Sequence, residues 1–100
     1  MKEVTLKSVY GDTYEGYVRT GKYSNGRRAI EIMSKTEGPI AKISVNVIDM
    51  LCPKDYTWIK NYSENEGFME QLIKQGVLSE PIQKAISGHV IVFLCKILSN

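Results

Sequence analysis

Apolar and polar residues alternate along the first half of the chain, which is typical of β-strands with one face in a core. Turn-forming residues separate four such runs, at residues 3–9, 13–20, 27–33 and 40–47. The Asn25-Gly26 pair is the strongest turn signal, because both residues tolerate the positive φ of a tight hairpin. These runs predict a four-stranded antiparallel meander.

The fourth run has the most regular pattern. Its apolar residues occupy every second position, at Ala41, Ile43, Val45 and Val47. A strict period of two predicts that all four side chains face one core, with the polar residues between them in solvent.

The pattern then changes to one that favours a helix. Residues 49–62 form a predicted loop with a short extended piece at 56–60, and an apolar stripe at helical spacing predicts a helix over 64–75. Ser63 and Glu66 have the spacing of a capping box, in which each side chain bonds the other residue's backbone N–H. Gly76 suits the end of this helix. Gly67 is costly in a first turn, so we expect an aromatic side chain to approach its backbone closely.

The last run, residues 89–98, is apolar on both faces, which predicts a strand in the middle of the sheet with the helix over one face. Residues 79–86 are ambiguous, although Pro81 could open a second short helix. The whole chain, residues 1–100, is thus expected to form a single α+β domain. Its antiparallel sheet of about five strands has one main helix on one face, in the order ββββαβ.

Composition supports a globular protein in a reducing compartment. Hydrophobic residues make up 43% of the chain and charged residues 24%, close to the average for folded domains. The first residues alternate charged and apolar side chains and contain no apolar core of a secretory signal. No run approaches the ~20 apolar residues of a membrane span. We therefore expect a cytoplasmic protein in which Cys52 and Cys95 are both free.

The residues that catalysis or metal binding would need are sparse. The single histidine, His89, stands beside a glycine at the start of a strand and has no nucleophile near it in sequence. With Cys52 and Cys95 it would supply only three zinc ligands, at spacings that match no zinc motif. No phosphate-binding glycine motif is present. The sequence therefore predicts no catalytic residue, no metal and no cofactor.

Charge is unevenly distributed although the net charge is only +2. Residues 1–35 hold seven Lys or Arg against four Asp or Glu, whereas residues 36–70 hold three against six. Basic and aromatic residues gather around the Asn25-Gly26 turn, and the candidate partner-binding residues are Arg19, Lys22, Tyr23, Arg27 and Arg28. Such a tip could bind an acidic protein surface or a phosphate backbone. Charge at a hairpin tip can equally serve solubility alone.

One segment resembles a known family. Residues 58–67 (WIKNYSENEG), followed by Glu70, Leu72 and Gly76, are similar to a block in small proteins of mobile elements and phages of gut bacteria. Residues 26–30 and 41–46 resemble strands of the same family, so that the likeness covers roughly residues 20–78, with a weaker match near Cys95. The family is a domain of unknown function, and some similar proteins inhibit the RNA-guided nuclease of type II CRISPR systems.

These observations lead to one main hypothesis and two alternatives. The resemblance and the absence of a catalytic constellation favour a non-catalytic binding or regulatory protein of a mobile element, anti-CRISPR-like and directed at a host protein. The first alternative is a nucleic-acid-binding module that uses the basic hairpin. The second is an enzyme of unknown type.

Overall fold

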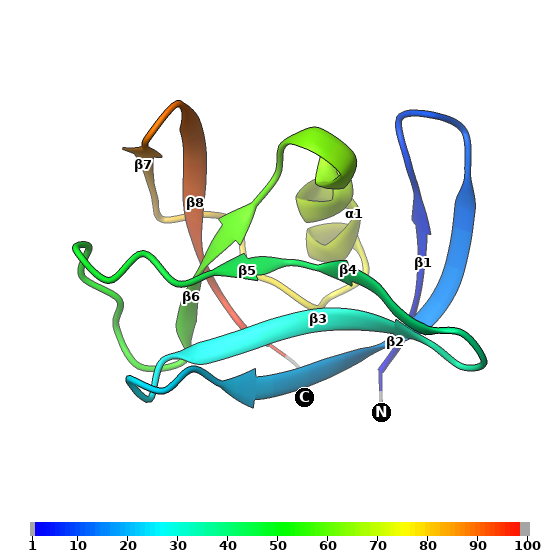
Figure 1. Ribbon diagram of the computed structural model, residues 1–100, viewed down its shortest axis with the longest axis horizontal. Coiled ribbons are helices and arrows are strands. Elements are labelled where there is room, and N and C mark those ends of the chain that lie inside the picture. Colours follow the sequence, from blue (N-terminus) through cyan, green and yellow to red (C-terminus); the bar gives the residue numbers. More distant parts are fainter. Residues whose placement is uncertain (1, 99–100) are drawn as a thin grey trace.

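The computed structural model describes residues 2–98, which form two antiparallel four-stranded sheets and a short α-helix (Figure 1). The first sheet has the order β1-β2-β3-β4, with bounds Glu3–Lys7, Thr13–Lys22, Arg28–Ser34 and Gly38–Lys42. The second has the order β5-β6-β8-β7, with bounds Ser44–Val45, Tyr56–Lys60, Val90–Lys96 and Gln83–Ser87. The α+β class and the antiparallel pairing are confirmed. The prediction of a single sheet of about five strands is wrong, because the structure has two sheets of four strands each.

The first sheet is the predicted meander. Its longest strand, β2, pairs with β1 through residues 13–17 and with β3 through residues 16–22. Gly16 lies where the two pairings overlap, and a Cβ placed there would come within 2.2 Å of the Met33 carbonyl oxygen. A side chain at this position would therefore push β3 away. Only glycine lets β2 pair with β1 and with β3 at the same residue.

The chain passes from the first sheet to the second at Ile43, between β4 and β5. The Ile43 N–H donates to the Ile30 carbonyl in the first sheet, and its carbonyl accepts from the Lys60 N–H in the second. Ala41 and Ile43 consequently lie in one apolar cluster, whereas Val45 and Val47 pack in another. The prediction that all four side chains face one core is wrong, because an unbroken alternation gives no sign of a strand that changes sheets.

The second sheet contains one strand that the sequence pattern did not predict. Residues 83–87 form β7, which pairs with β8 around a two-residue turn, Gly88-His89. The possible second helix at 79–86 is therefore wrong. β7 has few buried side chains, so its strand conformation depends on hydrogen bonding to β8 and not on its own apolar pattern. The extended piece at 56–60 is the full strand β6, which lies between β5 and β8.

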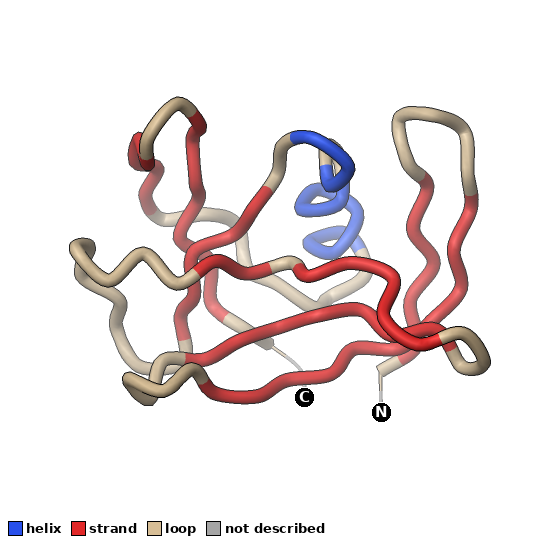
Figure 2. The backbone as a smooth tube through the Cα atoms, viewed as in Figure 1, coloured by secondary structure: helices blue, strands red, loops and turns tan. Residues whose placement is uncertain are grey.

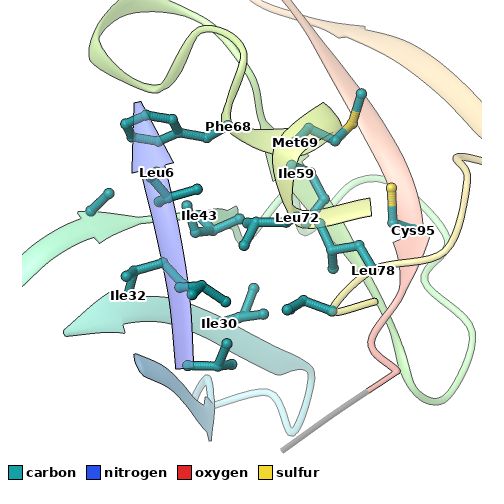
Figure 3. Packing of buried hydrophobic residues seen from close by; sticks show 14 of the residues in the cluster. Leu6, Ile30, Ile32, Ile43, Ile59, Phe68, Met69, Leu72, Leu78 and Cys95 are labelled. Carbon is teal, nitrogen blue, oxygen red and sulfur yellow. The ribbon is translucent and has the colours of Figure 1, made fainter. Parts of the chain in front are cut away.

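Both faces of the second sheet are covered. The main core gathers Leu6, Ile30, Ile43, Ile59, Leu72 and Cys95, whose side chains come together from both sheets and the helix (Figure 3). On the other face Trp58, Val92 and Leu94 are covered by side chains of residues 45–56. This explains why residues 90–96 are apolar on both faces, and it confirms the interior position predicted for that strand.

The helix α1 is shorter than predicted, Phe68–Lys74, and a 3-10 turn, η1 (Ser63–Asn65), precedes it. The prediction of a capping box is wrong, because no side-chain cap bond forms there and Ser63 itself has φ +55°. Asn61 instead accepts from the N–H groups of Gly67 and Met69, at 3.1 and 3.2 Å. Gly67 has φ +87°, and a Cβ there would meet only Gln71, at 3.7 Å. Its backbone conformation, and not a close aromatic neighbour, therefore requires the glycine.

One face of α1 closes the free edge of β1. The Gln75 side-chain amide exchanges two hydrogen bonds with the backbone of Thr5, at 3.0 and 2.8 Å. One turn earlier, Gln71 does the same with Lys7, at 2.8 and 2.9 Å. Two glutamines four residues apart thus take the place of a neighbouring strand. α1 lies between the β1–β2 hairpin and β8 (Figure 1).

Candidate partner-binding cleft

The basic hairpin tip forms one wall of a cleft. The turn between β2 and β3 and the loop between β5 and β6 lie at the same end of the molecule (Figure 2). The cleft between them has a volume of about 630 Å³. Its charged lining consists of Lys22, Arg27, Arg28, Lys54 and Asp55. Four cations therefore face one carboxylate, and the site is strongly basic although the protein as a whole is nearly neutral.

Arg27 holds the two walls together. Its guanidinium donates to the carbonyl oxygens of Val47 and Met50, at 2.7 and 2.6 Å, across 20 and 23 positions of sequence. The indole N–H of Trp58 donates to a third carbonyl of the same loop, that of Leu51, at 3.2 Å. The five N–H donors of an arginine suit this role, because a guanidinium can bind two carbonyls at once. Arg27 thus fixes the shape of the cleft, and its charge remains at the cleft wall.

Arg28 is paired with the single carboxylate. Its Nη1 lies 3.2 Å from Asp55 Oδ1, and the two side chains are 22% and 45% exposed. Asp55 has φ +69°, a left-handed conformation that aspartate tolerates better than most residues. The pair is partly solvated and at the long end of ion-pair geometry, so it contributes little to stability. An anion entering the cleft could therefore replace the Asp55 carboxylate at Arg28.

Arg19 and Tyr23 lie outside the cleft and already have partners. Arg19 bonds Glu31 across β2 and β3, with Nε 2.8 Å from Oε1. The Tyr23 hydroxyl lies 2.8 Å from the hydroxyl of Ser44, which is fully buried and also accepts from the Ile30 N–H. The Tyr23 hydroxyl therefore joins the hairpin to β5.

Two lysines in the cleft have no such role. Lys22 and Lys54 are exposed and face each other's wall, one from the end of β2 and the other from the loop. Within residues 2–98, neither ammonium group makes a hydrogen bond or an ion pair with another side chain. These two charges, together with that of Arg28, are the ones available to a partner.

The loop between β5 and β6 also carries exposed apolar side chains. Ile48 and Leu51 belong to the loop that Arg27 fixes, and they are 70% and 90% exposed. The Arg27 and Trp58 hydrogen bonds hold the backbone of this loop. The two exposed side chains therefore extend from a fixed backbone. The loop that forms one wall of the cleft therefore also carries two exposed apolar side chains, although neither of them lines the cleft itself.

The sequence prediction found three of the five charged residues that line this cleft. It singled out the hairpin residues Arg19, Lys22, Tyr23, Arg27 and Arg28, of which only Lys22, Arg27 and Arg28 line the cleft. It missed Lys54 and Asp55, which come from a loop that the pattern left without structure. Pro53 and the local charge were the only signals there, and neither indicates that the loop folds against the hairpin.

The nucleophilic and metal-binding candidates do not form a site. Burial raises the pKa of the Cys52 thiol, and the nearby Arg27 charge lowers it by less. Burial raises the pKa of Cys95 to about 12, so neither thiol is activated. His89 is exposed in the turn before β8. Within residues 2–98, no three His, Cys, Asp or Glu side chains gather in a way that could hold a metal ion.

Comparison with known proteins adds no relative. No family model, no curated protein and no solved structure matches the chain. The resemblance of residues 20–78 to a mobile-element family therefore stays a prediction. Over residues 2–98, no helix has the length and apolar character that crossing a membrane requires.

Proposed function

We propose that this protein is a non-catalytic binding protein that contacts an acidic surface of a partner protein through the basic cleft. The supporting observation is that four cations and one carboxylate line the cleft, while Lys22 and Lys54 have no ionic partner within residues 2–98. Uncompensated charge of one sign attracts a partner of the opposite sign and orients it during encounter.

The exposed apolar side chains of the loop between β5 and β6 favour a protein partner over a nucleic acid. Ile48 and Leu51 can bury their side chains only against another apolar surface, and protein interfaces combine such contacts with arginine and a charged rim. A phosphate backbone has no apolar surface against which these two side chains could be buried. With two uncommitted lysines and Arg28, the cleft would reach only about three phosphates, fewer than duplex-binding proteins contact.

The resemblance gives this proposal a biological setting. A regulatory protein of a mobile element, resident in the host cytoplasm and binding a host protein, fits a cofactor-free binding surface. Inhibitors of an RNA-guided nuclease, which some similar proteins are, act on a partner whose nucleic-acid channel is basic. The basic cleft would then bind an acidic surface elsewhere on such a partner.

Charge reversal in the cleft tests the proposal. The variant Lys22→Glu with Lys54→Glu removes the two free cations without disturbing the Arg27 and Arg28 bonds. The matched control, Lys2→Glu with Lys74→Glu, changes the net charge equally at exposed positions away from the cleft. Each protein is used to capture partners from host lysate, with a nuclease-treated duplicate, and captured proteins are quantified by mass spectrometry.

We expect a nuclease-resistant protein to be retained by the wild type and the control and to be lost with the cleft variant. Equal capture by all three proteins would show that the cleft is not the contact surface.

A separate titration addresses the nucleic-acid alternative. Affinity for single-stranded and duplex DNA is measured at low salt, where phosphate contacts are strongest. The alternative requires measurable binding that weakens by nearly one log unit per log of salt for each phosphate contacted. The proposal expects no such binding.

A further inference from the structure

The outer strand of the second sheet, β7, has a free edge. β7 is the last strand in the order β5-β6-β8-β7, so only β8 pairs with it. Within residues 2–98, no other backbone group or side chain bonds to residues 83–87, in contrast to β1, whose edge is closed by Gln71 and Gln75. A free strand edge is a template for another strand.

The register identifies the backbone groups at this edge. The two-residue turn makes Ser87 and Val90 a hydrogen-bonded pair, and Ala85 with Val92 is the next such pair. Lys84 and Ile86, which alternate with these residues, therefore direct their N–H and C=O groups away from β8. They offer two donors and two acceptors at the spacing that an added strand requires.

Apolar side chains border this edge. Ile86 and Ile91 are directly opposite each other in β7 and β8, and they are 73% and 47% exposed. Ile82, just before β7, is 60% exposed. The exposed isoleucines and the free backbone groups together form a surface on which an extended apolar segment can be both paired and buried.

Charge decides which kind of strand fits. Residues 81–98 contain Lys84, Lys96 and His89 but no Asp or Glu. If two copies paired through β7 about Ala85, the Lys84 side chains would lie on one face at a diagonal position, and like charges there oppose association. An edge lysine is also a common protection against self-pairing. A segment of another protein with an acidic residue near Lys84 meets neither obstacle.

We propose that β7 binds an extended segment of another protein by strand addition. Because Lys84 and Ile86 lie on the same face of β7, one face of this segment carries apolar and acidic residues two positions apart. The apolar residues contact Ile86 and Ile91, while an acidic residue pairs with Lys84. This surface lies on a different sheet edge from the basic cleft and does not depend on the function proposed for the cleft.

A pair of peptides tests the proposal. The full ¹⁵N-labelled chain is titrated with a peptide of roughly nine residues, the upper range of strand lengths. Valine and glutamate alternate at every second position of this peptide, with threonine between them, so that both occupy one face of the strand. The comparison peptide has lysine in place of each glutamate. We expect the acidic peptide to shift the amide signals of Lys84 and Ile86 but not those of Thr5 and Lys7, and the basic peptide to bind about tenfold more weakly.

Two variants locate the binding. Ile86→Pro removes an outward N–H while leaving the bonds of Ala85 and Ser87 to β8, so it should abolish binding. Lys84→Glu leaves the backbone unchanged and should reverse the preference between the two peptides; it keeps the test valid if the proline variant does not fold.

Three results would overturn the proposal. The first is that neither peptide binds, and the second is that binding is unchanged in Lys84→Glu. The third is a concentration-dependent dimer of the wild type that Ile86→Pro abolishes, since this would make a second copy the occupant of the edge.

Discussion

Each sheet ends in two outer strands, and β1 of the first sheet and β7 of the second have outer edges of different kinds. β1 has its outward backbone groups bonded by Gln71 and Gln75 of α1, whereas β7 has Lys84 and Ile86 facing solvent. Both strands are five residues long, and each is the first strand of a hairpin. The difference therefore comes from what packs against them. A helix with glutamine at two positions one turn apart converts an open edge into a closed one, and no such helix covers β7.

The largest effect is expected where the closed edge is opened. In Gln71→Ala with Gln75→Ala, the outward groups of Thr5 and Lys7 lose four hydrogen bonds, each with a net contribution of about 0.5–1.5 kcal/mol. We expect the free energy of unfolding to fall by about 2–3 kcal/mol, allowing for partial replacement by water. Urea unfolding measures it. Gln83→Ala, an exposed glutamine on β7, is the control, and an equal loss there would contradict the comparison.

The next effect concerns the residue that positions the closing helix. Asn61 accepts from two N–H groups at the start of α1, so Asn61→Ala should cost about 1–2 kcal/mol, as loss of a helix cap does. Ser63→Ala should be nearly neutral, because the Ser63 side chain makes no cap bond. Thermal or urea unfolding of both variants separates the two residues. A costly Ser63→Ala with a neutral Asn61→Ala would restore the capping box that the sequence predicted.

A smaller effect, confined to alkaline pH, tests the burial in the main core of β8, the strand that pairs with β7. Cys95 in β8 has its pKa raised from 9.0 to about 12 by burial, with a smaller contribution from Glu80 and Glu70. Because the raised pKa favours the neutral thiol in the folded protein, its contribution to stability is complete below pH 9 and is lost as pH rises from there toward 12.

At pH 10 we expect a loss of about 1 kcal/mol relative to pH 8. In Cys95→Ala this part of the pH dependence should disappear. An identical alkaline loss in the variant would mean that other groups cause it.

The smallest effect is expected on the open edge itself. Ile86 is 73% exposed, so Ile86→Thr should change the free energy of unfolding by less than about 0.5 kcal/mol. Urea unfolding of Ile86→Thr and of the wild type measures this difference in the free energy of unfolding. A loss above 1 kcal/mol would show that Ile86 is packed against something in solution and that the β7 edge is not free.

Local patterns in the sequence predicted some of these features and not others. The meander and the two-sided burial of residues 90–96 were predictable, because a period of two and a doubly apolar strand follow from local side-chain order. The crossing at Ile43 was not, since alternation is the same whether or not a strand changes sheets. The sequence could not show that Asn61, and not Ser63, caps the helix. Asn61 stands six residues before Gly67, and it reaches the Gly67 N–H only because of the turn between the two residues.

The candidate cleft shows the same limit. The basic residues around the Asn25-Gly26 turn were visible as a cluster, but sequence could not distinguish Arg27, which binds two carbonyls of a distant loop, from Lys22, which binds none of the described residues. Lys54 belongs to the cleft only because that loop folds back over β8. Contacts between residues at least 20 positions apart determine which charges are free, and no local pattern records them.

Hydrogen exchange of individual backbone amides tests the contrast between the two edges most directly. Thr5 and Lys7 donate to glutamine side chains, whereas Lys84 and Ile86 have no acceptor within residues 2–98. We predict that the first two amides exchange at least about an order of magnitude more slowly than the second two, measured by NMR under native conditions. Equal exchange rates in the two pairs would contradict the proposed contrast between the edges. Fast exchange of all four amides would mean that α1 does not close the edge of β1. Slow exchange of all four would mean that the edge of β7 is already covered in solution.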